Sequence, residues 1–233
     1  MNFDFSDDQK LLKEQVRKFL ADKCPTKTVR RVLDGNETHA DEVWKGLIEL
    51  GVTATAIPEE YGGLGLSPLE LCVVAEEIGR AAAPVPFDTS VVLATEALKL
   101  AGSEAQKKKW LPKLAAGEAI GTLAVAEGPQ PAKPRSTRTL FGGGRLNGKK
   151  VPVADGEAAT FAIVLANTGG SGDREAEACV TKVLHAVTLA GSSGRVTVTI
   201  SLAGAEPLPA AKKVAFFDDR NRKVLENIID SQS

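Results

Sequence analysis

The feature that most constrains the fold of this chain is a glycine-rich stretch followed at once by a helix-start signal. The stretch is GVTATAIPEEYGGLGLSPLELCVVAEEIGRAAAPVP, residues 51–86, and three of residues 62–65 are glycines that interrupt regular structure. Ser67 is expected to cap a helix, with Pro68 at the first helical position and Glu70 closing a capping box. Apolar residues then recur at helical spacing, and the face expected to be buried consists of Leu71, Cys72, Val73, Val74, Ile78 and Ala82.

Other segments in the first half of the chain also have helical periodicity. They predict helices over residues 3–23, 26–34, 41–50 and 88–101, and a further helix that begins after Ser103. Ser6 with Gln9, and Ser103 with Gln106, have the spacing of capping boxes. The first half of the chain is therefore expected to be all helical.

Two further expectations concern individual side chains in these helices. Glu76 and Arg80 have the i, i+4 spacing of a surface ion pair. Pro112 lacks an N–H donor and is expected to bend or end the helix that contains it.

Near Gly117 the pattern changes to short apolar runs separated by Gly, Pro and Ser. Strands or strand-turn units are expected at residues 121–127, 136–141, 142–148, 150–156, 160–168 and 195–203, whereas 180–190 suits either a strand or a helix. A last helix is expected at 218–233. The sequence thus predicts an α+β fold, with an N-terminal all-helical domain at residues 1–118 and a small β-barrel-like domain at residues 119–233.

Composition excludes several classes of function. The formal net charge of −1 gives no reason to expect nucleic acid or an anionic membrane surface as a partner. No apolar run approaches the roughly 20 residues of a membrane span, and the N-terminus lacks the pattern of a signal peptide. Three widely spaced cysteines, Cys24, Cys72 and Cys179, have no metal-ligand spacing. These features favour a reducing, cytoplasmic setting.

The residues by themselves indicate no catalytic or metal-binding constellation. His39 is interpreted as a solvated loop residue and His185 as a core or edge histidine, and neither has metal-ligand spacing to another ligand. The run GGGR at 142–145 lacks the lysine and the helix of a phosphate-binding loop, so a hairpin turn is expected there.

Four segments resemble the acyl-CoA dehydrogenase family in their order and spacing. They are FSDDQKLLKEQVRKFLA, IPEEYGGLGLSPLELCVVAEEIGR, EAQKKKWLPKLAAGEAIGTLAVAE, and the pair LNGKKVPVADG with FAIVLA. The resemblance runs from about residue 4 to residue 172 and covers that family's N-terminal helical domain and part of its middle β domain. Residues 173–233 match poorly.

The resemblance implies FAD as cofactor and an acyl-CoA thioester as substrate. In the family, a carboxylate base removes an α-proton while the β-hydride passes to flavin N5, so the acyl chain has to lie between base and flavin. The chain is therefore expected to be a flavoprotein oxidoreductase of fatty acid metabolism. It is expected to form a homo-oligomer, or a hetero-oligomer with a longer homologue.

The resemblance also implies six cofactor-binding positions: Leu123, Val125, Ala126, Pro152, Val153 and Ala154. In the family's Tyr-x-x-Thr-Glu-Pro pattern, Glu127 matches, while Leu123 and Ala126 replace the hydroxyl-bearing flavin contacts. In the Asn-Gly-Thr-Lys-x-Trp-Ile-Thr pattern, the matching residues are Asn147, Gly148 and Lys150, and an aromatic residue and a threonine are replaced by Pro152 and Ala154. Backbone groups at Val125, Ala126, Val153 and Ala154 are still expected to face the isoalloxazine ring.

The chain ends at Ser233, about where the family's third, helical domain is expected to begin. That domain supplies the family's catalytic glutamate, so no catalytic residue is assigned and the chain is expected to be incomplete as a catalyst on its own. One alternative is a non-catalytic subunit or truncated remnant that pairs with a full-length homologue. Another is that the residues after Gly172 come from a shifted reading frame or a truncated gene.

Overall fold

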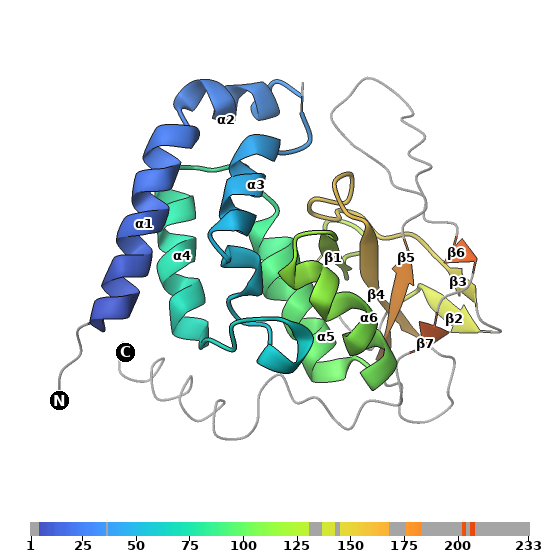
Figure 1. Ribbon diagram of the computed structural model, residues 1–233. Helices are drawn as coiled ribbons and strands as arrows, with labels where there is room; N and C mark the ends of the chain where they lie inside the picture. Colours follow the sequence, from blue (N-terminus) through green and yellow to red (C-terminus); the bar gives the residue numbers. More distant parts are fainter. Residues whose placement is uncertain are drawn as a thin grey trace, which may run out of the picture.

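The computed structural model describes residues 5–35, 37–130, 137–142, 145–167, 176–182, 202–203 and 206–207. Within these residues, helices are followed by a mixed sheet, so the α+β class is confirmed (Figure 1). The predicted tail helix, His185, the centre of the GGGR turn and most of the predicted strand 195–203 lie outside the described residues. The division into domains at residue 118 stays a prediction.

The predicted helical segments are helical in the structure. They are α1 (Asp7–Lys23), α2 (Thr26–Leu33), α3 (Asp41–Glu49), α4 (Pro68–Arg80), the π-helix η3 (Phe87–Ala94), α5 (Thr95–Ala101) and α6 (Glu104–Ala115), with 3-10 turns η1 (Val52–Ala54) and η2 (Glu59–Tyr61). Capping boxes begin α1, α4 and α6, as their serine and Glu or Gln pairs predict. None of the helices described is long and apolar enough to cross a bilayer.

Helix α4 has one buried face, which includes Leu71, Val73, Val74 and Ile78 as predicted. Two expected members of that face are wrong. Cys72 is exposed, because the buried face is centred near Val74 and Glu77 and Cys72 projects from the opposite side. Ala82 lies beyond the end of the helix, is exposed and has a φ of +47°.

The glycine loop before α4 is fixed by its backbone to the turn that precedes it. The N–H groups of Leu64, Gly65 and Leu66 donate to the carbonyls of Ala54, Ile57 and Thr55 at 2.9, 2.8 and 2.8 Å. A Cβ atom at Gly63 would collide with the carbonyl group of Ile57, so this close approach requires glycine. The loop thereby holds the start of α4 in place.

A buried carboxylate joins α4 to α1. The Glu77 side chain is fully buried, with Arg17 Nη2 at 2.7 Å from Oε1 and Arg80 Nε at 2.7 Å from Oε2. Hydrogen bonding by Arg17 lowers the pKa of Glu77 to about 2 in spite of burial, and Arg80 adds to this effect. The predicted Glu76–Arg80 ion pair is wrong, because Arg80 binds the buried Glu77 instead. Glu76 forms an ion pair with Lys13, with Nζ and Oε2 2.7 Å apart.

Two helix predictions in the 88–115 region need correction. Residues 88–101 do not form one α-helix, because η3 has π geometry and α5 follows it. The i→i+5 bonding of a π-helix breaks the 3.6-residue period on which the prediction depended. Helix α6 continues past Pro112 to Ala115, so the proline does not end it.

The strands of the described residues form one mixed sheet. They are β1 (Gly121–Ala124), β2 (Leu140–Gly142), β3 (Arg145–Asn147), β4 (Phe161–Asn167), β5 (Ala176–Lys182), β6 (Leu202–Ala203) and β7 (Glu206–Pro207). Their order is β6-β3-β2-β4-β5-β7, with β1 parallel to β4. The β2–β3 pair confirms the predicted hairpin, and residues 180–182 of the ambiguous segment belong to β5.

The helices and the sheet share a core. The Trp110 ring of α6 stacks on the Phe161 ring of β4, with centroids 4.2 Å apart. Ser90 Oγ of η3 accepts a hydrogen bond from the Gly121 N–H at the start of β1, at 3.1 Å. Figure 1 shows η3, α5 and α6 on the side of the helical part that faces the sheet. Helices η3 and α6 therefore contact β1 and β4, the strands next to the candidate site described below.

Replacing both Arg17 and Arg80 with methionine should destabilise the fold by about 3–5 kcal/mol, because Glu77 would stay buried without a partner. Each single replacement should cost less than half of this, since the other arginine remains. The measurement is urea unfolding followed by tryptophan fluorescence.

Lys13→Met is the matched control, because it removes an ion pair between the same two helices whose carboxylate, Glu76, is 54% exposed. Its cost should be about 1 kcal/mol or less. A double arginine variant no less stable than this control would contradict the role assigned to Glu77.

Candidate functional site

The six positions expected to face a flavin belong to two segments that lie side by side, residues 121–128 and 150–156. Val151 N–H donates to the Ala126 carbonyl at 2.8 Å, and Gly128 N–H donates to the Val151 carbonyl at 2.7 Å. Thr122 Oγ1 donates to the Ala154 carbonyl at 2.7 Å. The structure thus brings the two predicted groups together, while their part in cofactor binding stays a prediction.

The six side chains differ in exposure. Pro152 and Ala154 are exposed, whereas Leu123, Val125, Ala126 and Val153 are partly buried. Leu123 packs against the core cluster that includes Trp110 and Phe161, and Val153 packs against a smaller cluster in the sheet. Leu123 and Val153 therefore also contribute to the core of the β half.

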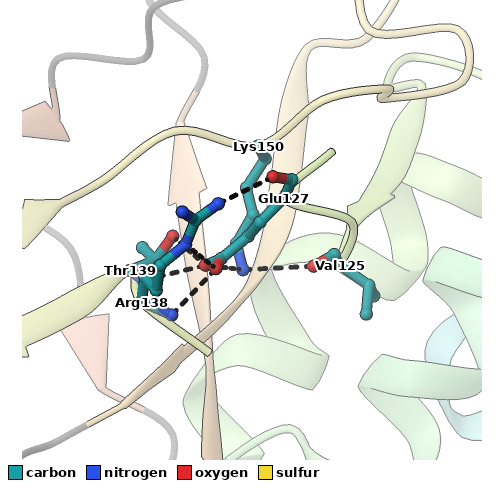
Figure 2. Close-up of polar contacts among 5 residues, drawn as sticks. All are labelled: Val125, Glu127, Arg138, Thr139 and Lys150. Atoms are coloured by element: carbon teal, nitrogen blue, oxygen red, sulfur yellow. Dashed lines mark hydrogen bonds and ion pairs between the residues drawn. The ribbon is translucent and has the colours of Figure 1, made fainter. Parts of the chain in front are cut away.

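A compact polar cluster holds the two segments together, as Figure 2 shows. Glu127 Oε1 accepts from Lys150 Nζ at 2.9 Å, from Thr139 Oγ1 at 2.7 Å and from the Thr139 N–H at 2.8 Å. Its other oxygen accepts from the Arg138 N–H at 2.8 Å. Lys150 Nζ also donates to the Val125 carbonyl at 3.2 Å, which ties the ammonium directly to the first segment.

The cluster holds its carboxylate in the charged form. Burial raises the pKa of Glu127, but hydrogen bonds from Thr139, the Arg138 N–H and Lys150 outweigh burial and lower this pKa from 4.5 to about 2. Burial also lowers the pKa of Lys150, and the neighbouring Glu127 charge opposes that change. The pair is thus a carboxylate facing the ammonium of a lysine whose side chain is 3% exposed.

The groups that remain available at the two segments fit a flat, partly apolar ligand with hydrogen-bond acceptors at its edge. Within the described part of the chain, the N–H groups of Ala126 and Ala154 have no hydrogen-bond partner. The side chains of the six positions themselves are all apolar. An isoalloxazine ring needs both an apolar contact and edge donors, so these residues fit it through the backbone.

The sequence did not indicate Arg138 and Thr139 as members of the polar cluster. Glu127 and Lys150 match family motifs, but 23 positions separate them, and Arg138 and Thr139 follow a proline-containing loop with no motif of their own. Only the pairing of the strands shows that these side chains meet.

The remaining polar candidates do not form a second site. His39 was interpreted as solvated, but its side chain is 12% exposed, with Nε2 2.9 Å from Asp41 Oδ1 and Nδ1 3.1 Å from Thr38 Oγ1. The expectation of a solvated histidine is therefore wrong, because most of the ring is buried and both of its nitrogens have polar contacts. Among the residues that the structure describes, no group of three or more His, Cys, Asp or Glu side chains could hold a metal ion.

The chain is similar to proteins of one known family. The model of the N-terminal domain of acyl-CoA dehydrogenases matches residues 6–118. Mitochondrial isovaleryl-CoA dehydrogenase of Pongo abelii is 36% identical over 170 residues, which cover 70% of this chain and 40% of that protein.

Solved structures give the same result for the fold. Butyryl-CoA dehydrogenase of Megasphaera elsdenii is 25% identical with a TM-score of 0.69, over 78% of this chain and 50% of that one. An acyl-CoA dehydrogenase of Bacillus anthracis complexed with FAD is 23% identical with a TM-score of 0.73, over 97% of this chain and 41% of that one, which shows the shared fold alone.

This chain belongs to the acyl-CoA dehydrogenase family. It spans between 40% and 42% of the length of the first five curated relatives, all named isovaleryl-CoA dehydrogenases.

Glu127→Gln should destabilise the protein by about 3 kcal/mol at neutral pH, because it leaves the Lys150 ammonium buried without an anion. The folded pKa of Glu127, about 2, lies below its ordinary value of 4.5. Its contribution is therefore present above that ordinary value and is lost as the pH falls towards 2. Urea unfolding across this range, in the wild type and the variant, measures both effects.

Glu118→Gln is the control, because Glu118 is an exposed carboxylate at the end of the helical part. It should change the free energy of unfolding by no more than about 0.5 kcal/mol. Equal stability of the two variants at pH 7 would show that the cluster does not stabilise the fold.

Proposed function

We propose that this chain binds FAD and provides the cofactor-binding part of an acyl-CoA dehydrogenase site. The supporting observation is that the two segments with family motifs lie side by side and leave the N–H groups of Ala126 and Ala154 available. Leu123, Val125, Ala126, Pro152, Val153 and Ala154 would hold the isoalloxazine ring by apolar contact and backbone donation.

The proposed reaction is the α,β-oxidation of an acyl-CoA thioester. FAD, when bound, would accept the β-hydride, which carries both electrons removed from the acyl chain, while the α-proton leaves to a base. The two carboxylates nearest the six positions are already used, because Glu127 is held by its cluster and Asp155 accepts from Thr89 Oγ1 at 2.6 Å. We therefore assign neither of them as the base that removes the α-proton, and we propose that this chain is incomplete as a catalyst alone.

We also propose that the chain is part of an oligomer and that it is cytoplasmic, and we propose no particular length for the acyl chain. The isovaleryl-CoA dehydrogenases among the relatives are named mitochondrial. The location of this chain is therefore best determined directly, by fractionation.

The first test is the absorption spectrum of the purified full chain after incubation with FAD and gel filtration. Bound flavin, with its visible bands retained by the protein, is the expected result. A protein that emerges colourless at every FAD concentration tried would refute the proposal.

Ala126→Thr combined with Ala154→Thr should tighten FAD binding, because these changes restore hydroxyl groups where the family pattern has them. Each added hydrogen bond should lower the Kd about threefold to tenfold. Isothermal titration with FAD measures the change. Ala158→Thr, on a partly buried alanine in the neighbouring turn, should leave the Kd unchanged.

A second function is supported by the apolar replacements at Leu123 and Ala126. A chain that has lost these hydroxyl contacts suits the role of a non-catalytic subunit that pairs with a longer homologue. Co-purification of such a homologue with the tagged chain from its native host, in the absence of bound flavin, would favour this function. A monomer that binds FAD would exclude it.

A further inference from the structure

The stability of the fold does not by itself explain why Lys150 is buried. This residue is 4% exposed, and its ammonium contacts both Glu127 and the Val125 carbonyl. Removing two charges from water costs so much that a buried ion pair is seldom more stabilising than apolar side chains of the same size. A buried lysine in this place is better explained by what it orients than by the energy of the pair.

The group that Lys150 orients is a peptide unit of the candidate site. The peptide between Val125 and Ala126 is trans and planar, so its carbonyl and its N–H point in opposite directions. Because Lys150 Nζ holds the Val125 carbonyl at 3.2 Å, the Ala126 N–H has to point away from the polar cluster. The next carbonyl, that of Ala126, is held by Val151 N–H at 2.8 Å, so the following peptide is fixed as well.

The Ala126 N–H is thereby presented as a donor. It has no partner within the described residues, and Ala126 is only partly buried. Glu127 keeps the ammonium in place from the opposite side, and Glu127 is itself held by Thr139 and the Arg138 N–H. The arrangement has the features of a preorganised donor, because its direction is set before any ligand arrives.

We propose that Lys150 is a positioning residue that, by holding the Val125 carbonyl, directs the Ala126 N–H at the FAD ring. This role rests on the proposed function, since it concerns the same two segments. Lys150 itself does not touch the ring and takes no part in proton or hydride transfer.

The test uses the full chain labelled with ¹⁵N, in which hydrogen exchange of the Ala126 amide is measured with and without FAD. In the wild type, FAD should slow exchange at this amide at least tenfold. In Lys150→Met, this protection should be lost and the Kd for FAD should rise about tenfold, the worth of one well-aligned hydrogen bond.

The matched control is Thr160→Val, which removes two hydrogen bonds to the Ile120 backbone, each 2.9 Å long, at the other end of β1 and β4. It should lower the Tm but leave the Kd within twofold of the wild type and the Ala126 amide protected. If Lys150→Met weakens FAD binding only by destabilising the β half, Thr160→Val should raise the Kd for FAD as well. Similar increases in the two variants would contradict the positioning role.

Two further results would overturn the proposal. One is a wild type that binds FAD without protecting Ala126, a result that requires no variant to fold. The other is a Lys150→Met variant that binds FAD with wild-type affinity and protection. A wild type that binds no FAD at all would refute the proposed function, and the positioning role with it, so failure of the two ideas is distinguishable.

Discussion

A carboxylate removed from water must be surrounded by donors, and this requirement decides how the parts of the chain are joined. Glu77 draws on Arg17, 60 residues away, and so fixes α1 against α4. Glu127 draws on Thr139 and Lys150, 12 and 23 residues away, and so fixes the exit of β1 against two later segments. In each case the electrostatic requirement of one side chain determines which backbone segments become neighbours.

The helical part matters to the candidate site because it supports the sheet edge from behind. Trp110 stacks on Phe161 in β4, Ser90 accepts from the first residue of β1, and Thr89 binds Asp155 next to Ala154. These contacts come from two helices and reach both segments of the site. The helices thus support the two segments that we propose bind the cofactor, including the positions where the hydroxyl side chains of the family pattern are replaced.

Much of the fold was predictable because its signals are local. Capping boxes and helical stripes depend on residues within one or two turns, and the helices they predicted are present. Errors arose where burial of a side chain or the backbone geometry differed from what the spacing predicts. Arg80 has a good neighbour in Glu76 but binds the buried Glu77, and the π geometry of η3 left no trace in an ordinary apolar pattern. The six expected cofactor positions rest on motif resemblance and stay a prediction, whereas the polar cluster beside them depends on strand pairing that no spacing in the sequence reveals.

The π-helix η3 has a consequence for how this chain can change in evolution. A π turn holds one residue more than the α turn from which it departs, so deleting a residue between Phe87 and Ala94 would leave a continuous α-helix. In an α-helix each residue turns about 100° from the one before, a larger step than in a π-helix, so the side chains of this segment would point in new directions relative to α5. Thr89 and Ser90 would no longer face Asp155 and Gly121, and the helical half would lose its hold on both segments of the site. The length of this segment is therefore constrained together with the hydroxyl side chains at Thr89 and Ser90.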